Sequence, residues 1–138
     1  MGPRAPIGAK AGCLHVNGYN NIKIDGIKYR ASLLAWLYMT GEWPIGIVDH
    51  ENRERNDDRW ENLRSATILQ NIANSGVRKD NRCGTKGVSI TKHRSKPFRS
   101  RITIYGKRIL LGDFATLDEA SRVYADASRK QFGEFSCV

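Results

Sequence analysis

Four polar residues in the middle of the chain have the types and spacing that metal-assisted hydrolysis requires. Asp49 and His50 are adjacent, eleven residues separate His50 from Asn62, and eight more separate Asn62 from Asn71. A carboxylate holds a hard cation through oxygen, and an imidazole that titrates near neutrality takes a proton from water. We therefore predict Asp49 and Asn71 as metal ligands, His50 as the general base and Asn62 as the residue that fixes the His50 ring. On spacing alone, a surface ion pair between Asp49 and His50 is the more common arrangement of such residues, and Asn is common in loops.

The elements around this pattern must bring its members together. Neighbouring residues on a strand point to opposite faces, so Asp49 and His50 serve one site only if their strand ends there. In the segment 51–61, which follows directly, ten of the eleven residues are charged or Asn. We therefore predict a strand over 45–48 that leads into a polar loop.

Local signals predict the other elements of this half. Asp25-Gly26 between apolar runs indicates a hairpin, because its turn needs positive φ. Thr67 and Gln70 form a capping box that begins a helix. The predicted elements are strands over 22–24, 27–29 and 63–66 and helices over 32–39 and 67–74.

The second half predicts a small α+β unit. Residues 75–84 are polar and carry two glycines, which indicates a linker. Three strand-like runs follow, over 88–91, 98–104 and 109–111. A capping box at Thr116 then begins an amphipathic helix. We predict a three-stranded antiparallel sheet packed on one helix.

The charge of the chain is concentrated in this half. The 138 residues carry a net charge of +9. Residues 1–80 hold 11 basic and 9 acidic side chains, a net of +2, whereas residues 81–138 hold 12 and 5, a net of +7. Between Arg82 and Arg108 there are nine basic residues and no acidic one. Such a block predicts a polyanionic partner, with a solvated basic face as the alternative.

Alternation assigns the polar side chains of the predicted strands to one free face, which suits the major groove of double-stranded DNA. Residues predicted to face the bases are Ser89, Thr91, Arg99, Arg101, Thr103 and Arg108. Residues predicted to contact phosphates at the rim are Lys86, Lys92, Arg94, Lys96 and Lys107.

Composition excludes other classes of protein. No apolar run approaches the roughly 18–20 residues of a membrane span. The residues at the N-terminus lack the apolar stretch of a secretory signal. Cys13, Cys83 and Cys137 are odd in number and widely spaced, which predicts neither a disulfide framework nor a zinc site. We expect a cytoplasmic protein with no membrane partner and no small-molecule cofactor.

Three motifs resemble the HNH endonucleases, most closely the phage and intron-encoded homing type. They are Val48-Asp49-His50-Glu51-Asn52, the run Asp58-Arg59-Trp60-Glu61-Asn62-Leu63-Arg64-Ser65-Ala66-Thr67, and Gln70-Asn71-Ile72-Ala73-Asn74. The resemblance implies a ββα-metal finger with one divalent cation, Mg²⁺ or another such as Mn²⁺. It implies the same roles for Asp49, His50, Asn62 and Asn71, and a supporting role for Asn74. The chain has Ser32-Leu33 where this family usually has His-Arg.

The second half resembles the DNA-binding domain of Apetala and ethylene-response factors. The resemblance rests on Lys86-Gly87-Val88-Ser89, Tyr105-Gly106-Lys107-Arg108, Leu111-Gly112-Asp113-Phe114 and Phe132-Gly133-Glu134-Phe135. That domain also follows HNH nucleases in phages, so the resemblance implies a phage protein acting in an infected bacterial host.

The predicted protein is a metal-dependent, site-selective DNA endonuclease, by default a monomer that nicks one strand. Its predicted domains are a nuclease domain over 1–75, a linker over 76–84 and a DNA-binding domain over 85–138. The missing His-Arg favours one alternative, a DNA-binding regulator whose nuclease half is inert. A second alternative is an RNA-binding protein, because a basic face alone does not separate RNA from DNA.

Overall fold

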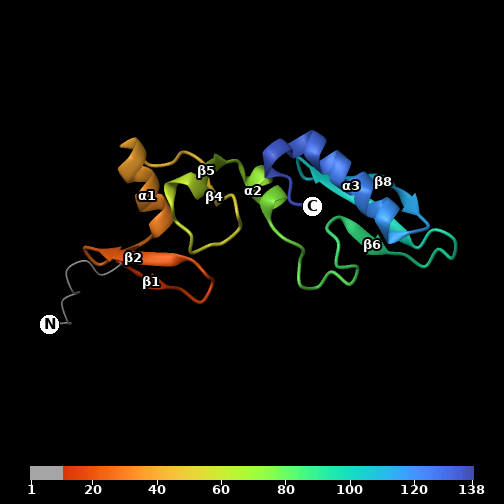
Figure 1. Cartoon of the computed structure of the whole chain (residues 1–138), viewed down its shortest axis with the longest axis horizontal. Coiled ribbons are helices and arrows are strands. Elements are labelled where there is room, and N and C mark those ends of the chain that lie inside the picture. Colours follow the sequence, from red (N-terminus) through yellow and green to blue (C-terminus); the bar gives the residue numbers. More distant parts are fainter. Residues whose placement is uncertain (1–10) are drawn as a thin grey trace. The chain divides into compact units, whose positions relative to one another are not determined.

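The computed structural model describes residues 11–138 of the chain (Figure 1). Its contacts divide it into two compact units, one ending at Ala66 and the other running from Thr67 to Val138. Residues 1–10, where we predict no secretory signal, lie outside the described residues. None of the described helices combines the length and the apolar character that crossing a membrane would need.

The first unit begins with a three-stranded antiparallel sheet. It consists of β1 (Cys13–Leu14), β2 (Asn20–Ile24) and β3 (Ile27–Arg30), in that order. Between β2 and β3, Asp25 and Gly26 have φ values of 48° and 85°. Positive φ at both central residues is the requirement of the hairpin turn, so the hairpin predicted from Asp25-Gly26 is confirmed.

A helix and a two-stranded hairpin complete this unit. Helix α1 (Ala31–Thr40) ends at Gly41, whose backbone N–H donates to Leu37 and whose φ of 78° suits glycine. Strands β4 (Ile47–His50) and β5 (Leu63–Ala66) pair antiparallel. β4 lies two residues later than the predicted strand over 45–48. It ends at His50, where the polar loop begins.

The second unit begins with helix α2 (Ile68–Asn74). Thr67 and Gln70 form the capping box expected from the sequence, which satisfies backbone donors at the start of the helix. Thr67 alone separates β5 from α2 along the chain. By its contacts α2 belongs to the second unit, whereas the sequence assigned it to the nuclease domain. The domain boundaries therefore stay a prediction.

The rest of this unit is one sheet and one long helix. Strands β6 (Val88–Ile90), β7 (Phe98–Ile104) and β8 (Lys107–Phe114) pair antiparallel in that order, and helix α3 (Leu117–Phe132) packs on the central β7 (Figure 1). A short 3₁₀ turn over Gly133–Phe135 follows. The described residues thus form three sheets and three α-helices, and the α+β class is confirmed.

The core of the second unit lies between β7 and α3. Ile102, Ala120 and Tyr124 are buried there. Strand alternation predicts that Ile90 and Ile109 face the helix, on the side opposite the polar residues, but both remain exposed. They lie on the two outer strands, and one helix packed mainly on the central strand leaves much of each outer strand uncovered.

Strand β8 is longer than the predicted run over 109–111, and it is irregular. Its pairing with β7 shifts between Ser100 and Arg101, so that Leu111 stands between the paired residues Leu110 and Gly112. Such a bulge inserts one unpaired residue without ending the strand. The extension places Asp113 directly opposite Arg99.

Candidate functional site

Strand β4 places Asp49 and His50 in the interior of the first unit, 4% and 5% exposed. The backbone N–H of Glu51 donates to the carbonyl oxygen of Asn62 at 2.9 Å, which closes the loop between β4 and β5. The β4–β5 hairpin, closed by this hydrogen bond, therefore holds the backbone of both residues in place. Burial at this depth distinguishes them from a solvated surface pair.

The ring of His50 contacts a carboxylate and an aromatic ring. Its Nε2 lies 3.1 Å from Oδ1 of Asp58, and its centroid lies 5.9 Å from that of Tyr19. Asp58 belongs to the polar loop, whereas Tyr19 lies just before β2. Two segments distant in sequence thus hold the imidazole.

The side chain of Asn62 is buried, and its hydrogen bonds go to the loop backbone. Its Oδ1 accepts from the N–H of Asn52 at 3.0 Å, and its Nδ2 donates to the carbonyl of Asp57 at 2.7 Å. The sequence predicted that Asn62 fixes the ring of His50. In the described structure Asn62 braces the loop that carries Asp58 instead, because it reaches both arms of that loop.

Asp49 pairs with an arginine across the hairpin. Arg64 is its cross-strand neighbour in the register, and Nε of Arg64 donates to Oδ2 of Asp49 at 3.0 Å. Directly opposed residues of opposite charge share one face of a sheet and attract each other. Arg64 thus compensates the charge of a buried carboxylate, which burial alone would disfavour.

A second ion pair orders the loop between β4 and β5. Arg59 donates from Nε and a terminal nitrogen to the two oxygens of Asp57, at 2.7 and 2.8 Å. These bonds, together with one from Asn52, hold the pKa of Asp57 well below its usual range. The polar loop is therefore built from specific contacts next to His50.

Asn71 and Asn74 both lie on α2. The side-chain amide of Asn71 is half-buried and makes no hydrogen bond within residues 11–138. Asn74, the last residue of the helix, is buried. The donor chemistry of Asn71 suits a hard cation, since its amide oxygen is a ligand of that class.

The described residues hold no cluster of three or more His, Cys, Asp and Glu side chains that could bind a metal ion. The buried carboxylate of Asp49 and the amide oxygen of Asn71 are each donors of the class that Mg²⁺ prefers. This ion keeps several of its waters and uses one or two carboxylates rather than a full protein cage.

Most of the predicted DNA-contacting side chains are accessible in the second unit. Those that are exposed are Ser89, Lys92, Arg94, Lys96, Thr103, Lys107 and Arg108. Arg101 and Thr91 are half-buried. The hydroxyl of Thr91 accepts from the N–H of His93 at 3.3 Å, so it also shapes the turn after β6.

Arg99 is engaged by an acidic side chain on the same face. Its Nε and a terminal nitrogen donate to the two oxygens of Asp113 at 2.6 and 2.7 Å. This bidentate pair lowers the pKa of Asp113 and raises that of Arg99. The segment from Arg82 to Arg108 contains no acidic residue, yet this face does carry one, because β8 continues past the predicted run and brings Asp113 into register.

Lys86 has a structural partner in place of the predicted phosphate. Its Nζ donates to the carbonyl oxygens of Ile72, Ala73 and Ser75 at 3.2, 2.5 and 2.6 Å. These carbonyls end helix α2, where the last turn leaves acceptors unsatisfied and the helix dipole favours a cation. Lys86 thus acts as a C-terminal cap from a distant segment.

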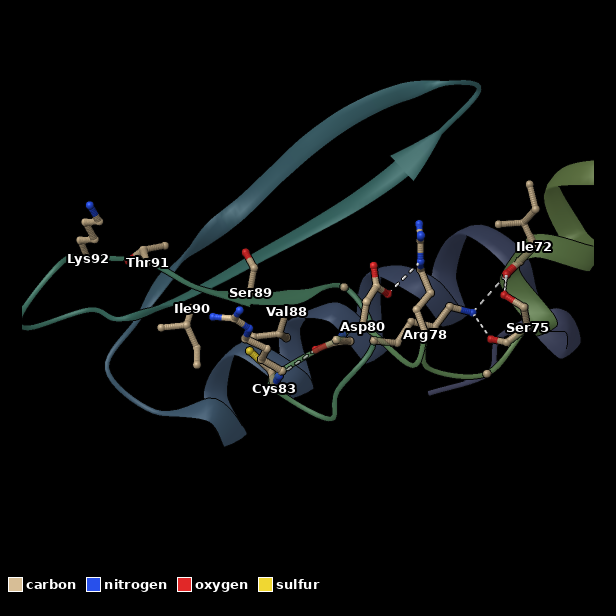
Figure 2. A pocket seen from close by; sticks show the side chains of 15 residues that line it. Ile72, Ser75, Arg78, Asp80, Cys83, Val88, Ser89, Ile90, Thr91 and Lys92 are labelled. Atoms are coloured by element: carbon tan, nitrogen blue, oxygen red, sulfur yellow. Dashed lines mark hydrogen bonds and ion pairs between the residues drawn. The ribbon is translucent and has the colours of Figure 1, made fainter.

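A cavity of about 680 Å³ lies beside this cap, between the segment after α2 and strand β6. Figure 2 shows Ile72 and Ser75 at one end of it and Thr91 and Lys92 at the other. The charged residues of its lining are Arg78, Asp80, Arg82, Lys86 and Lys92. It therefore continues the basic surface of the second unit.

Replacing Lys86 with Met is expected to destabilise the second unit. The Met side chain keeps the apolar stem but removes the ammonium, so the carbonyl of Ala73 loses a part-buried donor. A hydrogen bond to a charged group contributes about 1.5–3 kcal/mol, which urea unfolding of the full chain would measure. Lys96→Met, at an exposed position, is the control, and equal stability of the two variants would contradict the capping role.

Sequence reasoning missed three of these contacts, those of Asp58, Arg64 and Asp113. Asp58 is one of several charged residues in a loop without periodicity, and nothing local separates it from Asp57. The partners of Arg64 and Asp113 follow from strand register. Only Arg64 had a retrievable signal, because pairing of the predicted hairpin places it near Asp49.

No curated protein and no solved structure matches the chain. One family model does match, over a third of its length. The match covers residues 29–73, and the family is described as HNH endonuclease. The matched segment contains Asp49, His50, Asn62 and Asn71 and stops just before Asn74. The match supports nuclease activity on DNA.

Proposed function

We propose that this chain is a metal-dependent, site-selective DNA endonuclease of the homing type. The observation that carries the proposal is the pair Asp49 and His50. Both are buried where β4 ends, with a carboxylate on the imidazole, inside the segment that matches the HNH endonuclease family. General base catalysis needs a side chain that can accept a proton and that is held in place, and His50, with Asp58 on its ring and Asp49 next to it in sequence, meets this requirement.

In this proposal His50 removes the proton from the attacking water. Asp49 and Asn71 would hold one divalent cation, Mg²⁺ or Mn²⁺, through a carboxylate and an amide oxygen. When bound, such a cation stabilises the negative charge that develops on the phosphate oxygens. Arg64 keeps the Asp49 side chain in place, and Asn62 holds the loop from which Asp58 contacts the His50 ring.

The second unit supplies the choice of site in this proposal. Its outer sheet face carries Arg101, Thr103 and Arg108, and exposed lysines lie around the sheet. Arginine recognises guanine through two hydrogen bonds, whereas lysines near phosphates add affinity without selecting sequence. The proposed domain resembles the Apetala and ethylene-response-factor type and begins near residue 85.

Relaxation of supercoiled plasmid DNA tests the proposal directly. We expect the full chain to convert supercoiled DNA to the open circular form with Mg²⁺ or Mn²⁺, and EDTA to abolish the conversion. A monomer with one active site should nick before it linearises. Absence of cleavage with every divalent cation tested, on DNA that contains a bound site, would contradict the proposal.

Replacing the proposed ligands is expected to change metal dependence unequally. Asp49→Asn keeps an oxygen for Arg64 but removes the negative charge, so the Mg²⁺ concentration for half-maximal cleavage should rise at least about tenfold. Asn71→Ala removes a neutral ligand and should raise it less. The control is Asp80→Asn, an exposed carboxylate of the second unit. If both variants needed the same Mg²⁺ concentration as the unaltered protein, Asp49 and Asn71 would not be the metal ligands.

Two basic residues are expected to differ in what they do to DNA binding. Arg101→Ala, on the central strand, should weaken binding by ~1–3 kcal/mol at a single base position. Lys96→Ala should weaken binding to all sequences and lower the slope of log affinity against log salt by ~0.9. Titrations of specific and random duplexes measure both effects. The control is Arg122→Ala on α3, whose side chain is 77% exposed. If Arg101→Ala and Lys96→Ala change sequence preference and salt dependence in the same way, the proposed roles in base recognition and phosphate contact are contradicted.

A DNA-binding protein with an inert nuclease half is the second candidate. Ser32, which stands where the resembling family usually has His, is 2% exposed within α1. A buried serine leaves no space for an imidazole without displacement of its neighbours. The same plasmid assay separates the two candidates, since the inert protein would bind the duplex and leave it uncut.

A further inference from the structure

The geometry points to Asp58, anchored by Asn20, as the residue that positions the His50 ring. This inference rests on the proposed function for its role in catalysis. It differs from the sequence-based assignment, in which Asn62 holds the ring. It also extends the site beyond the segment that matches the HNH endonuclease family, because Asn20 lies before residue 29.

The contact between Asp58 and His50 defines the state of the imidazole. The Asp58 Oδ1 lies 3.1 Å from Nε2, and the two side chains are 15% and 5% exposed. An ionised carboxylate only accepts hydrogen bonds, so Nε2 is the ring nitrogen that carries a hydrogen toward Asp58.

Asn20 fixes the carboxylate in turn. Its Nδ2 donates to Oδ2 of Asp58 at 2.9 Å and to the carbonyl oxygen of Asn56 at 2.9 Å. A primary amide has two N–H donors, so both serve the loop. Asn20 is the first residue of β2, within a hydrogen-bonded sheet. A strand thus holds a loop residue that would otherwise depend on the loop alone.

The face of the imidazole is held by the same hairpin. The Tyr19 ring, adjacent to Asn20 in sequence, is tilted by 51° against that of His50. The guanidinium groups of Arg30 and Arg55 lie 4.3 and 5.2 Å from the centre of the Tyr19 ring. Cations over an aromatic ring attract it. The hairpin of β1 and β2 therefore acts on the His50 ring in two ways. Asn20 holds Asp58 against the Nε2 atom, and Tyr19 packs against the ring.

The state of the ring is measured on the full chain, independently of cleavage. In a ¹⁵N-labelled sample, long-range proton–nitrogen spectra show which ring nitrogen of His50 carries the hydrogen, with His50→Gln identifying its signals. We expect the hydrogen on Nε2 in the unaltered protein. Asp58→Ala should give a mixture of both tautomers, and Asn20→Ala should shift the same way to a smaller extent. Asp58→Asn, which keeps an acceptor oxygen, should retain Nε2–H.

Cleavage kinetics provide the second measurement. Asp58→Ala should lower kcat by about 10–100-fold, the usual effect of removing the partner of a functional imidazole. KM for DNA should stay unchanged, because the Asp58 carboxylate is only 15% exposed and is engaged by His50 and Asn20. Asp58→Asn should recover part of the lost rate. Glu61→Gln, an exposed charge of the same loop, is the control for net charge and should cut as the unaltered protein does.

The outcomes separate this inference from the proposed function. If the chain cuts no DNA but Asp58→Ala changes the tautomer as described, the proposed function fails and the positioning of His50 by Asp58 stands. If the chain cuts DNA and Asp58→Ala leaves tautomer and kcat unchanged, the positioning role is overturned. If Asp58→Ala does not fold, Asn20→Ala provides the test, because Asn20 holds the Asp58 carboxylate. An unaltered His50 tautomer in Asn20→Ala would then also overturn the inference.

Discussion

Replacing His50 with Ala is expected to reduce DNA cleavage by about 10²–10⁴-fold, the usual contribution of a general base. The imidazole is buried at the end of β4, its Nε2 is bound by Asp58, and an alanine at this position supplies no group that could accept a proton. DNA affinity should persist, since the proposed reading face lies in the other unit. Single-turnover cleavage and a binding titration measure the two effects separately.

The control for this variant is His93→Ala. His93 is exposed, and its Nδ1 accepts from the backbone N–H of Lys96 in the turn between β6 and β7. It lies in the second unit and has no role in the proposed chemistry. Cleavage by His50→Ala at the rate of the unaltered protein would contradict the general-base assignment.

Replacing Gly87 with Ala is expected to give a large loss of stability. Gly87 has a φ of 73°, and a Cβ added there would lie 2.0 Å from the ring of Tyr124. Tyr124 is buried on α3 and its phenol is desolvated, which raises its pKa. Because the ring is buried, the methyl group adds about 1–3 kcal/mol of overpacking to about 1–2 kcal/mol for the left-handed backbone.

Gly106 provides a matched control for this variant. Its φ is 74°, and a Cβ added there would meet nothing within 4 Å. Gly106→Ala should therefore lose only the backbone contribution. In a unit of this size each kcal/mol shifts the melting temperature by roughly 4–8 °C, so thermal unfolding resolves the difference. If Gly87→Ala and Gly106→Ala lowered the melting temperature equally, the contact between the added methyl group and Tyr124 would not contribute to the loss of stability.

Features that depend on a few neighbouring residues were predictable from the sequence. The capping boxes at Thr67 and Thr116 form as expected. So does the turn at Asp25-Gly26, where both residues have positive φ. In each case the residues that interact are within three positions of one another. The local sequence therefore contains both partners, and little chain entropy opposes their contact.

Candidate residues could be named from the sequence, but their contacts could not. Asp49, His50 and Asn71 were chosen by type and spacing, and their roles stay predictions. Asn62 was chosen as the partner of the imidazole, yet its hydrogen bonds go to the loop. In a loop where ten of eleven residues are charged or Asn, many pairings are chemically equivalent. Only the path of the backbone selects one of them.

By itself the sequence determined the order of the α-helices and of strands β2 to β8, but not β1. It also determined the basic character of the second half and the residues able to do chemistry near β4. The tertiary structure decided which charges are engaged. Asp58 lies on His50 because Asn20 holds the loop from another sheet, and Arg99 binds Asp113 because a bulged strand extends far enough to oppose it. Lys86 caps α2 from a segment twelve residues beyond the helix end (86 against 74). Charge attraction is not selective among the many possible partners in a chain this rich in charge. Strand register and packing bring particular pairs within hydrogen-bonding distance, and those are properties of the whole fold.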